Sequence, residues 1–162
     1  MRYEEKYNKL HDKLKSWLIK LGGKNRYNSK SGDNQPIDIR LKTGHTEYAP
    51  DVIWAWDGKK LIIELAFNED WRSVVGEACL CSMMEDCKKI IIFASVQDAK
   101  EEEFYTKLST LLDNKYRGRE LRYGVYIVPV DLELIRQKKI NKIKKIIFDN
   151  LKKKWQKSLK MV

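Results

Sequence analysis

The sequence predicts an α/β fold in which a mixed β-sheet is flanked by helices. Two observations lead to this prediction. The pair Asp57-Gly58 separates two apolar runs, residues 51–56 and 59–67, which is typical of an antiparallel hairpin with a tight turn. After residue 70 the chain alternates between helical and strand patterns, and strands that are joined through helices pair in parallel. The sheet is therefore expected to be antiparallel in its first part and parallel in its second.

Length and composition are those of one folded domain. The chain has 162 residues, of which 43% are hydrophobic and 35% are charged, so it can bury a core and is not of the disordered class. Its apolar runs are all shorter than the roughly 20 residues that a membrane helix needs. The charged N-terminus lacks the apolar centre of a secretion signal. We therefore expect a cytoplasmic protein with no membrane span.

The first third of the chain predicts one helix and one strand. Apolar residues recur every three or four positions over residues 3–21, and Gly22-Gly23 predicts the helix end. Residues 24–36 are polar and rich in turn formers, which predicts a loop. Residues 37–42 alternate apolar and polar side chains and predict a strand, which residues 43–49 are expected to end.

The hairpin that follows has two distinguishable faces. Side chains alternate along a strand, so Val52, Trp54 and Trp56 should point to one face and Asp51, Ile53 and Ala55 to the other. The second strand, 59–67, is almost wholly apolar, as expected near the middle of a sheet.

The rest of the chain predicts alternating elements: a helix over 70–87, a strand over 88–95, a helix over 98–115, a strand over 123–130, and a long helix from about 131. The last helix carries one apolar stripe, formed by Ile140, Ile143, Ile147, Leu151 and Trp155. The three cysteines, Cys79, Cys81 and Cys87, fall on one predicted helix and are interpreted as small buried residues of a reducing compartment.

Two carboxylates occupy unusual positions in the hairpin. Asp51 and Glu64 are about equally far from the Asp57-Gly58 turn, so they can lie opposite each other at its open end. Two carboxylates at close range repel unless a cation lies between them, and oxygen ligands suit Mg²⁺ or Mn²⁺. The alternative is that both are surface acids in ordinary ion pairs. The apolar context of Glu64, "LIIELAF", argues against that alternative because a charge there is costly without a partner.

This pattern resembles a known family. The dipeptide Pro50-Asp51, the hairpin, Glu64 in an apolar strand, and "GEA" at 76–78 resemble the PD-(D/E)XK (restriction-endonuclease-like) nuclease superfamily. The nearest likeness is to archaeal Holliday-junction resolvases. Residues 1–95 resemble the α-β-β-β-α-β core of that family. Residues 96–162 then form an α-β-α extension that ends in a basic amphipathic helix, within a single domain over 1–162.

The resemblance implies a divalent-metal-dependent endonuclease that hydrolyses DNA phosphodiesters. It implies that Asp51, Glu64 and the Leu65 carbonyl hold Mg²⁺ or Mn²⁺, with no small-molecule cofactor. An acid of the first helix, Glu4 or Glu5, would accompany them. The family's junction-cutting members are dimers, so a homodimer is carried over as an expectation.

One departure bears on activity. The family has a lysine two residues after the second acid, where this chain has Ala66, which can neither position water nor offset negative charge. Replacements from the following helix are Arg72 and Glu77, and Lys60 is a poorer choice. Alternatively, the chain is a catalytically inactive PD-(D/E)XK-like DNA-binding protein or partner subunit.

Basic residues favour a polyanionic partner. The net charge is +10 and the isoelectric point is near 9.4, which favours nucleic acid, with DNA preferred, or an anionic membrane surface. The last helix segment contributes a cationic face, which can equally be a solvated lysine face. A third hypothesis is a protein-interaction scaffold that uses Trp54, Trp71 or Trp155, although these residues are more simply core. The residues predicted to bind nucleic acid are Lys24, Arg26, Lys30, Arg40, Lys42, Arg117 and Arg119.

Overall fold

The structure is a computed structural model that describes residues 3–34, 37–41, 44–84, 86–117 and 124–162, with the side chains of 9–33, 47–84, 86–113 and 124–162. Its elements in chain order are α1 (Tyr3–Lys24), β1 (Asn28–Ser31), the 3-10 turn η1 (Gly32–Asn34), β2 (Ile37–Leu41), β3 (Gly44–Tyr48), β4 (Val52–Trp56), β5 (Lys59–Ala66), α2 (Trp71–Ser82), β6 (Cys87–Val96), α3 (Ala99–Arg117), β7 (Gly124–Asp131), α4 (Leu132–Arg136) and α5 (Ile140–Lys154).

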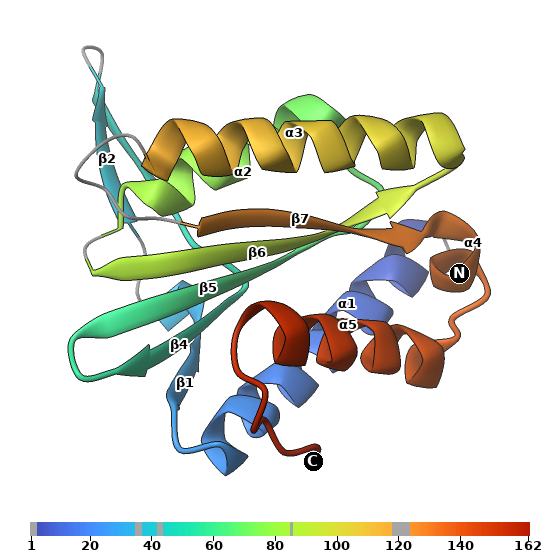
Figure 1. Cartoon of the computed structure of the whole chain (residues 1–162), viewed down its shortest axis with the longest axis horizontal. Coiled ribbons are helices and arrows are strands. Elements are labelled where there is room, and N and C mark those ends of the chain that lie inside the picture. The colour runs from blue at the N-terminus through green and yellow to red at the C-terminus, as the bar shows by residue number, and fades with distance from the viewer. Residues whose placement is uncertain (1–2, 35–36, 42–43, 85, 118–123) are drawn as a thin grey trace.

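The architecture is α/β, with helices on both faces of a five-stranded mixed sheet in the order β1-β4-β5-β6-β7. Helices α2 and α3 cover one face, and α1, α4 and α5 cover the other (Figure 1). Strands β1, β4 and β5 pair antiparallel, whereas β5–β6 and β6–β7 pair in parallel. The predicted change from antiparallel to parallel pairing is confirmed.

The hairpin of β4 and β5 forms as predicted. Trp56 pairs with Lys59, and the two residues between them, Asp57 and Gly58, have φ of 44° and 72°. Positive φ at both central positions is the geometry that matches the twist of the strands, and it explains the Asp-Gly pair.

Two apolar cores lie on the two faces of the sheet. Val52, Trp54 and Leu61 contribute to the core under α1 and α5, whereas Ile53 and Ile62 contribute to the core under α2 and α3. The predicted alternation of side chains along the hairpin is therefore correct.

The first strand of the main sheet is not the predicted one. Residues 24–36 were expected to be a loop, but Asn28–Ser31 form β1 and pair with β4. The predicted strand at 37–42 does form as β2, but it pairs with β3 in a separate two-stranded sheet. The expectation that 43–49 only ends a strand is wrong. Strand β1 has the sequence NSKS because an edge strand with alternating exposure needs no apolar side chains.

Several element boundaries also differ from the prediction. Helix α1 continues past Gly22-Gly23 and ends where Arg26, with φ of 68°, closes a C-terminal turn through Tyr27 N–H to Gly22 O. The long helix expected from 131 is two helices, because Lys138 takes φ of 52° and closes α4 in the same way. The helix expected over 70–87 ends at Ser82, and Cys87 begins β6.

The predicted apolar stripe of the last helix is confirmed in position. Ile143, Ile147 and Leu151 are fully buried, and Trp155 and Ile140 pack at the margin of the same core. Among the helices that the structure describes, none combines the length and apolar composition that crossing a membrane requires.

Candidate active site

Asp51 and Glu64 meet at the open end of the β4–β5 hairpin. Val52 pairs with Ile63, so Asp51 stands directly opposite Glu64 in the same register. The Asp51 N–H donates to Glu64 Oε1 over 3.0 Å, and the Leu65 N–H donates to Asp51 Oδ2 over 2.8 Å. Glu64 shares a face with Ile62 and Ala66, on the side of the sheet that α2 covers. The two carboxyl groups therefore converge, as the spacing from the turn predicted.

The environment gives the two acids opposite charge states. Glu64 is only 3% exposed, and burial, followed by the charges of Asp51 and Glu77, raises its pKa well above the ordinary value. Burial also raises the pKa of Asp51, but the hydrogen bond and charge of His11 and the Leu65 N–H outweigh it and leave that pKa lowered. Near neutral pH the site consequently holds an ionised Asp51 beside a carboxyl group that retains its proton more readily.

A second pair of acids adjoins the first. Glu69 follows the end of β5, and Glu77 lies in the second turn of α2. Both therefore lie at the same end of the sheet. Burial, and then a hydrogen bond with Glu69, raises the pKa of Glu77 to about 9. The Oε2 atoms of both residues are buried with no other hydrogen-bond partner among the described residues, and a proton shared between the two groups would satisfy both.

His11 of α1 completes the site, and the sequence pattern did not reveal this. His11 Nε2 lies 3.3 Å from Asp51 Oδ1, and this hydrogen bond raises the pKa of His11. One helical turn later, Lys15 Nζ lies 3.0 Å from Asp33 Oδ2 in η1. Helix α1 covers the face of the sheet that lies opposite α2. His11 nevertheless reaches Asp51, because Asp51 lies just before the first residue of β4. The periodicity of α1 marks His11 as a residue at the margin of the buried stripe, but it does not say which strand end that margin meets.

Tyr48 and Cys81 close the site from β3 and α2. The Cys81 thiol lies 3.7 Å from Glu64 Oε1 and donates to it, and Tyr48 hydrogen-bonds Cys81. Burial, and then the charge of Glu64, raises the pKa of Tyr48, so its hydroxyl stays protonated. The interpretation of the cysteines as small buried residues is confirmed for Cys81 and Cys87 and is wrong for Cys79, which is exposed.

The side-chain oxygens gathered at this site are donors that suit a hard divalent cation, but they are not at present arranged around one. Carboxylate oxygens surround this end of the sheet and come from Asp51, Glu64, Glu69 and Glu77. The raised pKa values of Glu64 and Glu77 favour their protonated forms. Within the described part of the chain, however, no three His, Cys, Asp or Glu side chains are arranged as ligands of one metal ion. Both Asp51 oxygens and Glu64 Oε1 are engaged by protein groups. A cation at Asp51 and Glu64 therefore requires these internal hydrogen bonds to exchange.

The two sequence comparisons with known proteins assign no function to this site. The chain matches no protein-family model, and a search of curated proteins finds no match either.

The remaining predicted site residues fall in different places. Arg72 is exposed, and its guanidinium lies 5.1 Å from the ring centre of Trp71, beside Asp70 rather than beside the carboxylate pair. Lys60 pairs with Ala55 near the turn, at the end of the hairpin opposite the site. Ala66 is fully buried on the same face as Glu64, so β5 supplies no basic group there.

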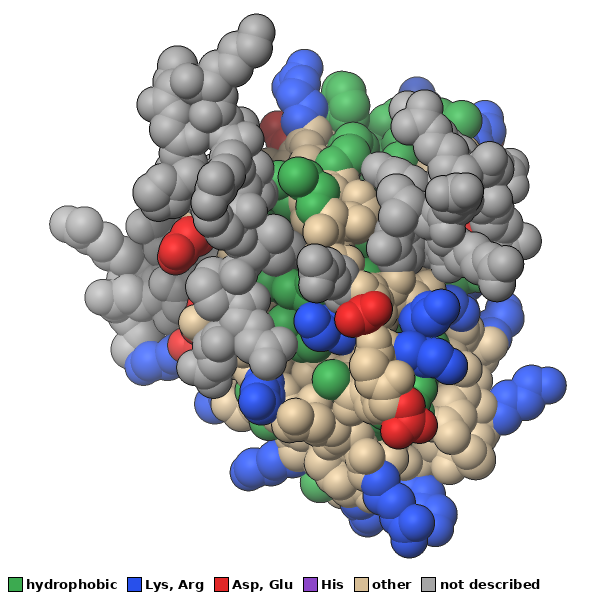
Figure 2. All heavy atoms as spheres, turned by 90° about the vertical axis from the view of Figure 1, so that its left-hand side faces the viewer, with side chains coloured by type: hydrophobic (Ala, Val, Ile, Leu, Met, Phe, Trp, Pro, Cys, Tyr) green, Lys and Arg blue, Asp and Glu red, His purple; other side chains and the backbone are tan. Residues whose placement is uncertain are grey.

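The structure separates the predicted nucleic-acid contacts. Lys30 pairs with Ile53 on the edge strand β1, so it shares a face with the carboxylate pair. Lys24 and Arg26 lie six and four residues before Lys30, at the turn end of the hairpin and away from the carboxylate pair. Figure 2 shows this turn end, where Lys and Arg side chains project around the lower part of the face. The side chains of Glu4, Glu5, Arg40 and Arg117, and residues Lys42 and Arg119, lie outside the described residues.

Proposed function

We propose that this protein is a divalent-metal-dependent phosphodiester hydrolase that acts on nucleic acid, DNA in the first instance. The single observation that carries the proposal is the contact between Asp51 and Glu64. Two acids placed 13 residues apart meet across a hairpin end, one of them 3% exposed, with no arginine or lysine between them among the described residues. A buried carboxyl group without a cationic partner destabilises the fold, and strongly perturbed acids of this kind cluster at functional sites, which supports a chemical role for the pair.

The arrangement of the core supports a restriction-endonuclease-like fold. Helix α1 precedes three strands that pair antiparallel, β1, β4 and β5. Helix α2 then leads to β6, which pairs in parallel with β5. This is the element order that the resemblance implies, with the β2–β3 hairpin inserted after the first strand.

The metal would be held by Asp51, Glu64 and the Leu65 carbonyl, and when bound it would polarise the phosphate and lower the pKa of a water molecule. The chain's own residues divide the remaining work. His11 orients Asp51 and offsets its charge, which is part of what the absent lysine would do. Glu77, whose pKa is about 9, carries a proton at neutral pH and can deliver it to a leaving oxygen. Lys30 binds phosphate from the edge strand.

The test compares Asp51→Asn and Glu64→Gln with the parent chain on plasmid, linear, single-stranded and four-way DNA. Each reaction is run with Mg²⁺, Mn²⁺ or EDTA, and Glu102→Gln, an exposed acid of α3, serves as the matched control. We expect metal-dependent cleavage that both site variants reduce at least a hundredfold and that the control retains. Cleavage that survives in both site variants would remove this function from the site.

A specific observation favours a second candidate, a catalytically inactive DNA-binding protein or partner subunit. Ala66 is fully buried at the lysine position, and three of the four carboxylate oxygens of Asp51 and Glu64 are satisfied within the protein. This candidate predicts DNA binding without cleavage under every metal condition. If about six phosphates are neutralised, the affinity should fall by roughly a thousandfold between 50 and 200 mM salt.

A further inference from the structure

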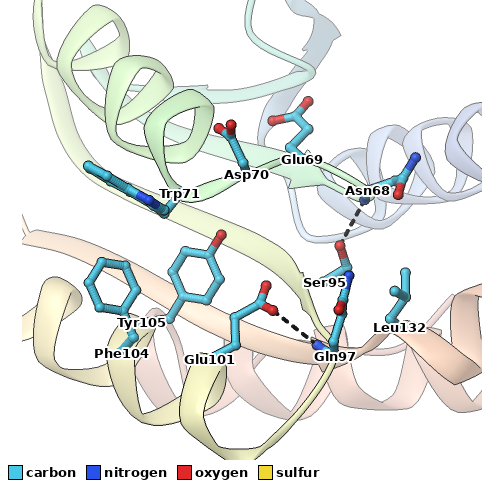
Figure 3. Close-up of a pocket in the computed structure, with 10 residues that line it drawn as sticks. All are labelled: Asn68, Glu69, Asp70, Trp71, Ser95, Gln97, Glu101, Phe104, Tyr105 and Leu132. Carbon is cyan, nitrogen blue, oxygen red and sulfur yellow. Dashed lines mark hydrogen bonds between the residues drawn. The ribbon is translucent and has the colours of Figure 1, made fainter.

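A pocket of about 440 Å³ opens beside the carboxylate site, where the parallel strands β5 and β6 end. Its walls come from the loop between β5 and α2 on one side and from the start of α3 on the other (Figure 3). Ser95 of β6 forms the floor, where its hydroxyl accepts from the Asn68 N–H over 2.8 Å. Pockets at the carboxyl ends of parallel strands are common ligand sites.

Two exposed aromatic rings stand at the pocket. Trp71 begins α2 and is 46% exposed, and Phe104 of α3 is 42% exposed. The rings meet edge to face with centres 5.9 Å apart, and Phe104 contacts Tyr105 over the same distance. Large exposed rings that pair across two elements form an apolar surface that the fold itself does not cover.

The charge of this pocket is opposite to that of the protein. The chain carries a net charge of +10, yet the described residues that line the pocket include three acids, Glu69, Asp70 and Glu101, and no Lys or Arg. A phosphate group is therefore repelled here. Aromatic faces combined with carboxylates attract organic cations, because both present negative potential to the ligand. Arg72 lies outside this lining, with its guanidinium 5.1 Å from the ring centre of Trp71, so one face of that ring already holds a cation of this kind.

A buried hydroxyl points into the same space. Tyr105 is 1% exposed, lines the pocket, and has an Oη atom with no hydrogen-bond partner among the described residues. Figure 3 shows this hydroxyl directed from α3 toward Trp71 and Asp70. A buried hydroxyl without a hydrogen-bond partner is costly, and an N–H group of a ligand in this pocket would satisfy its oxygen as an acceptor.

We infer that this pocket binds an organic cation, an alkylammonium or guanidinium group, against the exposed rings of Trp71 and Phe104, with Glu101 and Asp70 as counter-charges and Tyr105 Oη as acceptor. The site is distinct from the proposed hydrolase chemistry, although Glu69 borders both. The cation has two sources with the same chemistry: a free polyamine, or the Lys or Arg side chain of a partner protein. The Asp70 carboxylate also caps α2 through Ser73 N–H, so it is fixed in place.

The experiment is calorimetric titration of the full chain with agmatine and spermidine. The neutral comparison is N-butylurea, which keeps the four-carbon chain and a planar urea in place of the guanidinium and lacks the terminal amine. We expect agmatine to bind at least tenfold more tightly than N-butylurea. Glu101→Gln should weaken agmatine binding about tenfold, and Trp71→Ala about threefold. Matched controls on α3 are Glu102→Gln and Leu111→Ala, which are exposed outside the pocket and should bind as the parent does.

The outcomes are separable. The inference would be overturned if agmatine and N-butylurea bound equally well. It would also be overturned if both pocket variants had native circular dichroism and bound agmatine as the parent does. Single-stranded DNA binding that Trp71→Ala weakens and Glu101→Gln strengthens would also overturn it, because the pocket would then hold a nucleobase. An arginine-containing pentapeptide that binds at least tenfold more tightly than agmatine identifies a partner protein as the source, and equal affinities identify a free cation.

Discussion

At Glu64 the structure holds a carboxyl group in the interior of the sheet, and the consequence for stability depends on pH. Its pKa is raised in the folded protein because burial disfavours the charged form. The folded state therefore binds a proton more tightly than the unfolded chain, whose ordinary value is 4.5. Stability from this group is complete below that value and is lost as the pH rises toward the folded pKa. Glu77 acts in the same sense, up to a pKa of about 9.

Glu64→Gln should therefore stabilise the metal-free protein at pH 8. A neutral amide keeps the Oε1 acceptor for the Asp51 N–H and removes the cost of a buried charge, so we expect a gain of about 1–3 kcal/mol in the free energy of unfolding. The measurement is thermal unfolding in EDTA at pH 5 and pH 8, with Glu102→Gln as the exposed control. The gain should be small at pH 5. A variant that is less stable than the parent at pH 8 would contradict this account of Glu64.

Asp51 has the opposite linkage. Its pKa is lowered mainly through His11 against the effect of burial, so its contribution to stability is present above the ordinary value of 3.8 and is lost as the pH falls. The spacing of Asp51 and Glu64 from the turn predicted their contact. It did not predict that His11 would stand beside them, because that depends on how α1 crosses the sheet.

At the scale of the element, α1 shows why two adjacent glycines play different parts. A Cβ atom on Gly22 would lie 2.5 Å from Trp54 Nε1 and 2.7 Å from Ser29, whereas a Cβ on Gly23 would have nothing within 4 Å. The Trp54 indole donates to Leu18 O over 3.1 Å, so this contact fixes α1 on the sheet. Gly22 permits a close approach, and Gly23 only lowers the helix propensity.

Exchanging each glycine for alanine should consequently have effects of opposite sign. Gly22→Ala should destabilise the protein by about 1–3 kcal/mol, because Trp54 and β1 must move. Gly23→Ala should stabilise it by up to about 1 kcal/mol, because alanine favours the helix. Urea unfolding gives both values, and Trp54 packing is followed by near-ultraviolet circular dichroism. The two variants are each other's control, and equal losses in both would show that Gly22 has no special packing role.

Strand β1 shows what the sequence pattern of a single element cannot predict. Its four residues are polar and carry no strand signal, and only pairing with β4 makes them extended. Strand β2 has the alternating pattern that β1 lacks, and that pattern predicted a strand of the main sheet. Edge strands depend on the backbone of a neighbour more than on their own side chains, and that neighbour is chosen by the tertiary structure.

At the scale of the whole molecule, both cores combine residues from the two parts of the chain. Ile143, Ile147 and Leu151 of α5 lie in one core with Leu14 and Leu18 of α1. Strand β7 pairs with β6 over the register from Lys89–Gly124 to Val96–Asp131, and so covers the last strand of the first 95 residues. Residues 96–162 are therefore an integral part of this fold and not only an extension of its core.

A fragment of residues 1–95 should fail to fold on its own. It would expose the edge of β6 and the apolar surface that β7, α3 and α5 bury, and this loss exceeds the few kcal/mol that stabilise a small domain. We expect no cooperative thermal transition by circular dichroism and poor dispersion of amide resonances. The control is a chain of residues 1–160, which lacks the exposed Met161 and Val162 and should melt as the parent does. Cooperative unfolding of the 1–95 fragment would mean that the first part is an independent unit.

The amino-acid pattern was enough to predict the α/β class, the β4–β5 hairpin, the alternation of its two faces and the meeting of Asp51 with Glu64. All of these depend on local periodicity and on a turn whose geometry is set by two residues, Asp57 and Gly58. Only the tertiary structure decided which polar segment became the edge strand, how α1 brings His11 to Asp51, and that Trp71, Phe104 and Tyr105 line one pocket. Those features arise where elements distant in the sequence pack together, and the pattern of one element does not contain the position of the next.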